Sequence, residues 1–290
     1  MPKPGDNTVI NRRQFLTSSS CAALATGVGG LSQVLRAAPQ AESELGRVKV
    51  VDVQTATIRF RYDMHLVKVI TDSGIYGIGE AYNRGGVINH IQNIKRHVIG
   101  QDPLMVDVLT QKMMDSGVGQ GSLSGSLTGA ISGIETALWD VAGKILNVPV
   151  YVLLGGRFRD KVLLYHDTGS PNTVNPKPWV EEAEKTREFG FRTTKFDLNP
   201  FGGERWNRAV SSEDLKAWIR ILEAIRDYLG PDFPLGVDFH WKLNTHNAKQ
   251  FVEMARHLNL WCVEDPMPPG NADACVRLTA MSPIPIATGE

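Results

Sequence analysis

Five short β-forming runs alternate with four helix-forming runs in the second half of the chain, and this alternation restricts the fold more than any other feature. The strand candidates occupy residues 162–166, 193–197, 235–238, 260–263 and 284–287, and the helix candidates occupy residues 178–189, 212–229, 247–258 and 272–280. Repeated strand–helix units build a parallel sheet, because each crossover helix returns the chain to the same edge. We therefore predict a parallel α/β domain over residues 156–290.

A doubly wound sheet and a (β/α)8 barrel share this order of elements. The first strand candidate is not followed by the glycine-rich turn that binds phosphate in dinucleotide-binding folds, so the barrel is favoured. Only five strands fit before Glu290. An open five-stranded remnant would expose sheet edges and an apolar interior, so we expect an incomplete barrel, that is, a piece of a longer protein.

Residues 46–155 have a different pattern, which predicts a smaller α+β domain. Short runs rich in Val, Ile and Thr occupy residues 48–80, and Asp72-Ser73-Gly74 predicts a hairpin within them. The Gly- and Ser-rich segment 116–125 is either a plain linker or a mobile loop that contacts substrate. Helical spacing recurs in residues 87–99, 105–114 and 127–146.

Residues 1–45 resemble an export signal and linker. Arg12 and Arg13 stand before an uncharged run of small and apolar residues from Cys21 to Leu35. That run is shorter than the roughly 20 apolar residues of a membrane span. The paired arginines resemble the twin-arginine motif, so we expect export by that route to a periplasmic or extracytoplasmic location. A disordered tail with a chance Arg-Arg pair is the alternative.

The balanced charge argues against nucleic acid as a partner and against a membrane beyond the export signal. Lys plus Arg and Asp plus Glu both number 31, so no net field attracts a polyanion, and a small-molecule ligand fits better. The three cysteines exclude a disulfide framework, since Cys21 lies in the expected signal. Cys262 and Cys275 form either one bridge or two free thiols.

Three acidic residues end three successive strand candidates at a constant spacing of 26 residues: Asp238, Glu264 and Glu290. One strand–helix unit separates each acid from the next, so the three should meet at the carboxyl rim of the barrel, where catalytic groups lie. Converging carboxylates repel one another unless a cation lies between them. All-oxygen ligation favours Mg²⁺. The alternative is that these acids cap helices or pair with arginines.

Two basic residues are expected beside the acids. His240, two positions beyond Asp238, should point to the same side and transfer a proton near neutral pH, unless it is a solvated loop residue or another metal ligand. Lys195 lies near the end of the second strand candidate with Asp197 facing the same way. It could be a base or a carboxylate anchor, or simply the ion-pair partner of Asp197.

Other polar residues have weaker claims to a role. His166 and Asp167 follow the first strand candidate and could contact substrate or form a structural pair. Arg157 and Arg159 could bind an acid, although a salt bridge at the domain junction is the more frequent use of such arginines. No chemistry is assigned to the remaining histidines, which are His65, His90, His97, His246 and His257.

Over residues 48–290 the sequence resembles the mandelate racemase/muconate lactonizing enzyme branch of the enolase superfamily. The runs that carry the resemblance are AISGIETALWD at 130–140, PVYVLLGG at 149–156, VEDP at 263–266 and IATGE at 286–290. The resemblance implies an α+β capping domain with a modified barrel, and Mg²⁺ bound by Asp238, Glu264 and Glu290. It also implies removal of the proton next to a substrate carboxylate through a metal-stabilised enediolate.

The Asp238-Phe239-His240 arrangement is similar to that of the galactonate and mannonate dehydratases of this branch, in which the matching histidine protonates the departing hydroxyl group. Racemases of the branch often carry a second lysine where Asp197 stands, so racemisation with Lys195 as the base is disfavoured. The other base of the family, a histidine on a later strand, would lie beyond Glu290.

The resemblance therefore implies a hydro-lyase that converts a sugar acid to a 2-keto-3-deoxy acid. A racemase, epimerase or cycloisomerase of the same superfamily is one alternative. A non-catalytic truncated or carboxylate-binding exported protein is another. Homo-oligomers are frequent among full-length members of the superfamily.

Overall fold

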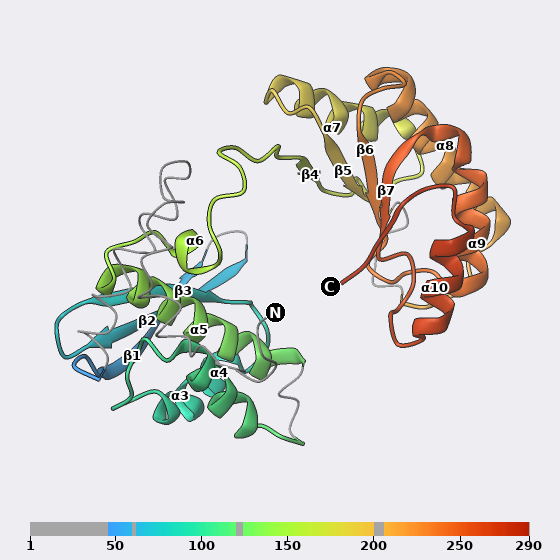
Figure 1. Cartoon of the computed structure of the whole chain (residues 1–290). Helices are drawn as coiled ribbons and strands as arrows, with labels where there is room; N and C mark the ends of the chain where they lie inside the picture. Colours follow the sequence, from blue (N-terminus) through green and yellow to red (C-terminus); the bar gives the residue numbers. More distant parts are fainter. Residues whose placement is uncertain (1–45, 60–61, 120–123, 200–205, 290) are drawn as a thin grey trace, which may run out of the picture. The chain divides into compact units, whose positions relative to one another are not determined.

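The chain forms two compact units, Met1–Asp160 and Lys161–Glu290, in a computed structural model that describes residues 46–59, 62–119, 124–199 and 206–289 (Figure 1). The predicted export signal, with Arg12 and Arg13, lies outside the described residues, and so does Glu290. The units divide after Asp160, whereas the sequence pattern places the domain boundary after residue 155.

The first unit is an antiparallel sheet covered by helices, as the α+β prediction requires. The strands β1 (Val50–Arg59), β2 (Asp63–Thr71) and β3 (Tyr76–Ala81) pair in that order. The predicted hairpin joins β2 to β3, where Gly74 adopts φ +81 and donates its N–H to the carbonyl of Thr71. The helical elements are α3 (Val87–Ile94), η2 (Lys95–His97), α4 (Val106–Asp115), α5 (Gly125–Ile145) and α6 (Val150–Leu153).

The second unit is a five-stranded parallel sheet whose spatial order, β4-β5-β6-β7-β8, follows the sequence. A doubly wound sheet reverses its strand order at a switch point, whereas a barrel does not, so this order agrees with part of a barrel. The elements are β4 (His166–Thr168), α7 (Pro176–Glu188), β5 (Thr194–Asp197), α8 (Ser212–Leu229), β6 (Leu235–Asp238), α9 (Thr245–Met254), η3 (Arg256–Leu258), β7 (Leu260–Glu264), α10 (Ala272–Met281) and β8 (Ile286–Ala287). The predicted parallel α/β fold is confirmed.

The first strand of this sheet begins later than predicted. Residues 162–165 are exposed and without regular structure, and β4 begins at His166. Its partner β5 begins at Thr194, which pairs with His166, so the residues before His166 have no neighbouring strand to bond. Residues 162–165 therefore remain outside the sheet although their composition favours a strand.

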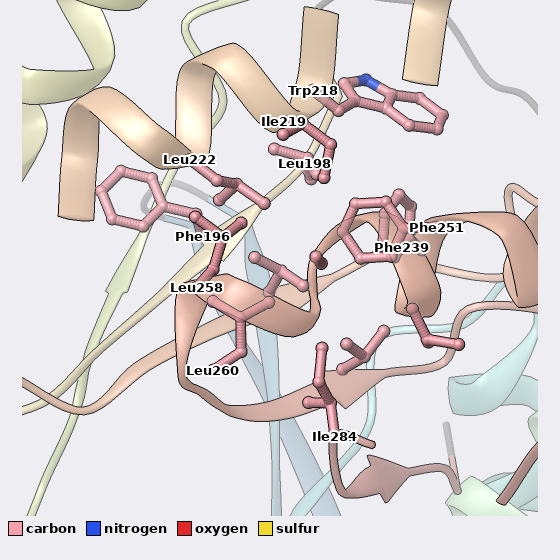
Figure 2. Packing of buried hydrophobic residues seen from close by; sticks show 14 of the residues in the cluster. Phe196, Leu198, Trp218, Ile219, Leu222, Phe239, Phe251, Leu258, Leu260 and Ile284 are labelled. Atoms are coloured by element: carbon pink, nitrogen blue, oxygen red, sulfur yellow. The ribbon is translucent and has the colours of Figure 1, made fainter. Parts of the chain in front are cut away.

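The core of the second unit lies between the sheet and its helices (Figure 2). Phe239, directly after β6, packs against Trp218 of α8 and Phe251 of α9, with ring centroids 5.2 and 4.7 Å apart. The core also receives Phe196, Val237 and Val263 from β5, β6 and β7. Side chains alternate along a strand, so the residues next to these in the sequence face the opposite side of the sheet.

The two cysteines of the described ranges, Cys262 and Cys275, both lie in the second unit. Cys262 and Cys275 are both free thiols, which excludes the bridge between them. Across the described ranges, no helix has the length and apolar character that crossing a bilayer would require.

Candidate functional site

The register of β5, β6 and β7 brings three of the predicted site residues together on the face of the sheet opposite the core. Asp238 pairs with Glu264 across the β6–β7 ladder, and Lys195 lies on the neighbouring strand β5. The Lys195 ammonium donates hydrogen bonds to Oδ2 of Asp238 at 3.0 Å and to Oε2 of Glu264 at 2.8 Å. The side chains of Lys195 and Asp238 are only 7% and 6% exposed. These residues form a compact, largely buried charge cluster.

The charge of Lys195 is stabilised by its carboxylate neighbours. Burial by itself would lower the pKa of the Lys195 ammonium, but the hydrogen bonds to Glu264 and Asp238, with the charges of Asp238 and Asp167, raise that pKa well above its ordinary value. Asp167 Oδ1 lies 3.8 Å from the ammonium nitrogen. Lys195 is therefore a cation at neutral pH, which suits the binding of an anion better than the acceptance of a proton.

His240 reaches the same cluster through a turn of the backbone. Both His240 and Trp241 adopt left-handed conformations, with φ of 47 and 57, so the chain does not continue in the extended form on which the period-two expectation rests. The backbone N–H of His240 donates to Oδ1 of Asp238 at 2.9 Å. Its Nδ1 lies 3.4 Å from Oδ1 of Asp197 and 3.5 Å from Oδ1 of Asp238. The imidazole thus lies beside two carboxylates, at the side of the sheet that was predicted.

A buried lysine that the sequence pattern did not reveal completes this arrangement. Lys242, in the loop between β6 and α9, donates to Oδ1 of Asp197 at 3.1 Å, and its side chain is 8% exposed. Lys195 pairs with Asp167, Asp238 and Glu264, so the alternative pairing of Lys195 with Asp197 is not seen among the described contacts. A loop lysine two residues after a histidine carries no periodic signal, which is why sequence reasoning missed it.

The contacts of Asp197 and His240 shift the pKa of each in opposite directions. Burial alone would raise the pKa of Asp197, but the hydrogen bond with His240 and the charge of Lys242 lower it overall. The hydrogen bond with Asp197 and the nearby charge of Asp238 raise the pKa of His240 above its ordinary 6.5, against the effects of burial and of Lys242. The pair therefore favours an ionised carboxylate and a protonated imidazole.

Of the weaker candidates, His166 and Asp167 of the second unit lie outside this cluster or at its margin. His166 shares a 2.8 Å hydrogen bond with Thr186 and stacks on Phe191, which supports its structural reading. Asp167 is exposed, and its carboxylate lies 3.8 Å from the Lys195 ammonium nitrogen. Arg157 forms a solvent-exposed salt bridge with Asp160.

The donor chemistry of Asp238 and Glu264 fits a hard cation. Each contributes a carboxylate oxygen, and one oxygen from each already bonds to a cation, the Lys195 ammonium. Within the described ranges no group of three or more His, Cys, Asp or Glu side chains is arranged to hold a metal ion. The third predicted ligand, Glu290, lies outside those ranges.

Both units match protein families. Residues 47–155 match the family described as the mandelate racemase / muconate lactonizing enzyme N-terminal domain. Residues 179–290 match the family described as enolase C-terminal domain-like. The two matched segments contain the first unit's sheet and helices and all strands of the second unit except β4.

Curated relatives include acid-sugar dehydratases. The chain is 38% identical over 246 residues to D-xylonate dehydratase of Haloferax volcanii, which covers 83% of this chain and 60% of that protein. It is 34% identical over 227 residues to D-galactonate dehydratase of Cronobacter sakazakii, which covers 77% of this chain and 57% of that protein. The chain thus spans about 60% of the length of these relatives, whose names imply small-molecule substrates.

A solved structure is also similar. The mandelate racemase/muconate lactonizing enzyme-like protein from Rubrobacter xylanophilus superposes with a TM-score of 0.75 at 31% sequence identity. The superposition covers 82% of this chain and 65% of that one.

Proposed function

Given that the chain belongs to the mandelate racemase/muconate lactonizing enzyme branch of the enolase superfamily, we propose that the protein dehydrates a sugar acid to a 2-keto-3-deoxy acid. Relatives named as D-xylonate and D-galactonate dehydratases support this reaction class. The position of His240, with Nδ1 within 3.5 Å of carboxylate oxygens of Asp197 and Asp238, is the observation that carries the proposal.

The reaction requires a base that removes the proton from C2 and an acid that donates a proton to the departing hydroxyl group. The C2–H bond breaks, its proton goes to a base, and its electron pair enters the enediolate. That pair then forms the C2–C3 double bond, while the hydroxyl group at C3 leaves with the electron pair of the C3–O bond and an added proton, as water. The resulting enol then tautomerises to the 2-keto acid. His240 is the proposed donor to the hydroxyl, because its contacts with Asp197 and Asp238 raise the pKa of the imidazole and so favour its protonated form. The proton that it loses is regained from solvent, since the side chain is partly exposed.

Lys195 is proposed to bind the substrate rather than to take its proton. Its ammonium lies beside the carboxylates of Asp167, Asp238 and Glu264, which raise its pKa, so at neutral pH it has no lone pair with which to accept a proton. A lysine ammonium is instead suited to the carboxylate of an acid sugar. We assign the base to none of the described residues.

Asp238 and Glu264 are the proposed ligands of Mg²⁺, together with Glu290. A bound Mg²⁺ would stabilise the negative charge of the enediolate that forms when the proton next to the carboxylate is removed. The carboxylate donors of Asp238 and Glu264 suit this hard cation and lie on adjacent strands.

Export by the twin-arginine route to a periplasmic or extracytoplasmic location is a separate proposal. It rests on Arg12 and Arg13 and on the uncharged run that follows them. Fractionation of the native host, with the wild-type chain compared with a chain carrying Arg12→Lys and Arg13→Lys, tests it. Export of both chains to the same extent would contradict it.

A library of aldonic and aldaric acids that includes xylonate and galactonate tests the reaction. We expect Mg²⁺-dependent formation of a 2-keto-3-deoxy acid, which is lost with EDTA and restored by Mg²⁺. Exchange of the α-proton with deuterium from solvent without loss of water would favour a racemase, epimerase or cycloisomerase. Substrate binding without either reaction would favour the non-catalytic carboxylate-binding alternative.

A further inference from the structure

We propose that the Lys195 ammonium is an internal counter-ion that holds the cation position between Asp238 and Glu264 and moves toward Asp167 when a divalent metal binds there. The proposal deepens the metal site in the proposed function and rests on it. Metal binding at this site is then an exchange of one cation for another, rather than the filling of a preformed ligand set.

The contacts of Lys195 place it where a metal's charge is needed. The ammonium bonds to Asp238 at 3.0 Å and to Glu264 at 2.8 Å, and both oxygens belong to the side chains expected to bind metal. Asp238 is 6% exposed, so its charge requires a compensating cation inside the protein. A divalent ion bound by these two carboxylates would lie close to the ammonium, and the two positive charges would repel each other, so metal binding disfavours the present position of the ammonium.

A second resting position for the ammonium is present on the neighbouring strand. Asp167 pairs with Lys195 in the β4–β5 ladder, and its Oδ1 is already 3.8 Å from the ammonium nitrogen. The ring of Tyr165 has its centroid 5.4 Å from the same atom, within the range of a cation–π contact. The lysine side chain is long and flexible. A short movement would therefore take its ammonium from the carboxylates of Asp238 and Glu264 to the carboxylate of Asp167 and the ring of Tyr165.

Three variants of the purified full chain separate this exchange from a static bridge: Lys195→Met, Asp167→Asn and the double variant. Mg²⁺ affinity is measured by isothermal titration calorimetry, and the midpoint of thermal unfolding is measured in EDTA and in Mg²⁺. Neither readout depends on turnover. The matched control is Lys185→Met, which removes an ammonium from the exposed pair with Glu182 on α7.

We expect Lys195→Met to unfold at a lower temperature in EDTA, because two adjacent carboxylates lose their cation, and to bind Mg²⁺ about tenfold more tightly than the wild type. Its unfolding temperature should therefore rise more on addition of Mg²⁺ than that of the wild type. Asp167→Asn should weaken Mg²⁺ binding in the wild-type background by about threefold and by clearly less in the Lys195→Met background, where no ammonium has to move. Lys185→Met should leave Mg²⁺ affinity unchanged.

Equal or weaker Mg²⁺ binding by Lys195→Met would overturn the exchange, and an equal effect of Asp167→Asn in both backgrounds would overturn Asp167 as the destination. If Lys195→Met does not fold, Lys195→Gln keeps hydrogen-bond donors without the charge and should also bind Mg²⁺ more tightly. Failure of the wild type and every variant to bind Mg²⁺ would refute the metal site of the proposed function. Equal binding by all of them refutes the exchange alone.

Discussion

Nδ1 of His240, in the turn after β6, lies 3.4 Å from Oδ1 of Asp197 at the end of the neighbouring strand β5. The same oxygen of Asp197 accepts a hydrogen bond from Lys242, which follows His240 in the same loop. The carboxylate of Asp197 on β5 therefore contacts two side chains of the β6–α9 loop, those of His240 and Lys242. This connection gives Asp197 a role in setting both the orientation and the charge of His240.

Substitution of His240 should lower turnover more than substitution of Asp197. His240→Gln removes the proposed proton donor and should lower kcat by about 100-fold or more, with a small change in KM. Asp197→Asn leaves the imidazole in place but weakens its orientation and charge, so kcat should fall by about tenfold. Steady-state kinetics on the best sugar acid, with circular dichroism as a control for folding, measures both. Equal activity of His240→Gln and wild type would remove His240 from the chemistry.

The raised pKa of His240 makes stability depend on pH in a defined direction. A group whose pKa is raised by folding binds a proton more tightly in the folded state, so its contribution is full below the ordinary pKa of 6.5 and is lost as pH rises through the folded pKa. The loss of stability caused by His240→Gln should therefore be larger at pH 5 than at pH 9. Urea unfolding in EDTA at both pH values measures it, and a larger loss at pH 9 would contradict the sign.

Phe239 should be a major contributor to stability although it lies between two site residues. Its side chain is fully buried and contacts the rings of Trp218 and Phe251. Phe239→Ala should lower the free energy of unfolding by about 3–5 kcal/mol. Phe158→Ala is the control, because Phe158 is 96% exposed and should change that free energy very little. Urea denaturation followed by circular dichroism compares the two variants.

Gly79 of β3 should tolerate no side chain, because α5 packs directly on the strand. A Cβ at this position would clash with the backbone carbonyl of Gly133. Gly79→Ala should lower the free energy of unfolding by roughly 1–3 kcal/mol, since the helix has to move away from the sheet. Gly85→Ala meets no atom within 4 Å and serves as the control. Thermal unfolding that is unchanged in Gly79→Ala would show that the strand and helix are less closely packed.

Elements with strong local signals could be predicted closely from the sequence. The predicted bounds of α8 are those observed, because Ser211 and Asp214 form a capping box at its start and Gly230, with φ 85, stops it. The strand β6 also ends at Asp238 as predicted. By contrast, β4 was misplaced because strand bounds depend on where the partner strand begins.

The sequence predicts which residues lie in the site better than it predicts which of them contact one another. The 26-residue spacing indicated that Asp238 and Glu264 lie together, and the β6–β7 register pairs them. The ion-pair partners of Lys195 and Asp197 depend on side-chain geometry across three strands. The spacing of residues in the sequence does not determine that geometry. The positive φ of His240 is equally hard to predict, because a histidine gives only a weak local signal for a left-handed turn.

The alternation of faces along β6 has a consequence for engineering. Val237 and Phe239 face the core, while Asp238 between them carries the charge cluster. Inserting or deleting a single residue in this strand would exchange the two faces, turning the carboxylate toward the phenylalanine rings and an apolar side chain toward the reactive side. Changes of specificity in this protein should therefore be sought by varying loop residues, with the strand lengths kept constant.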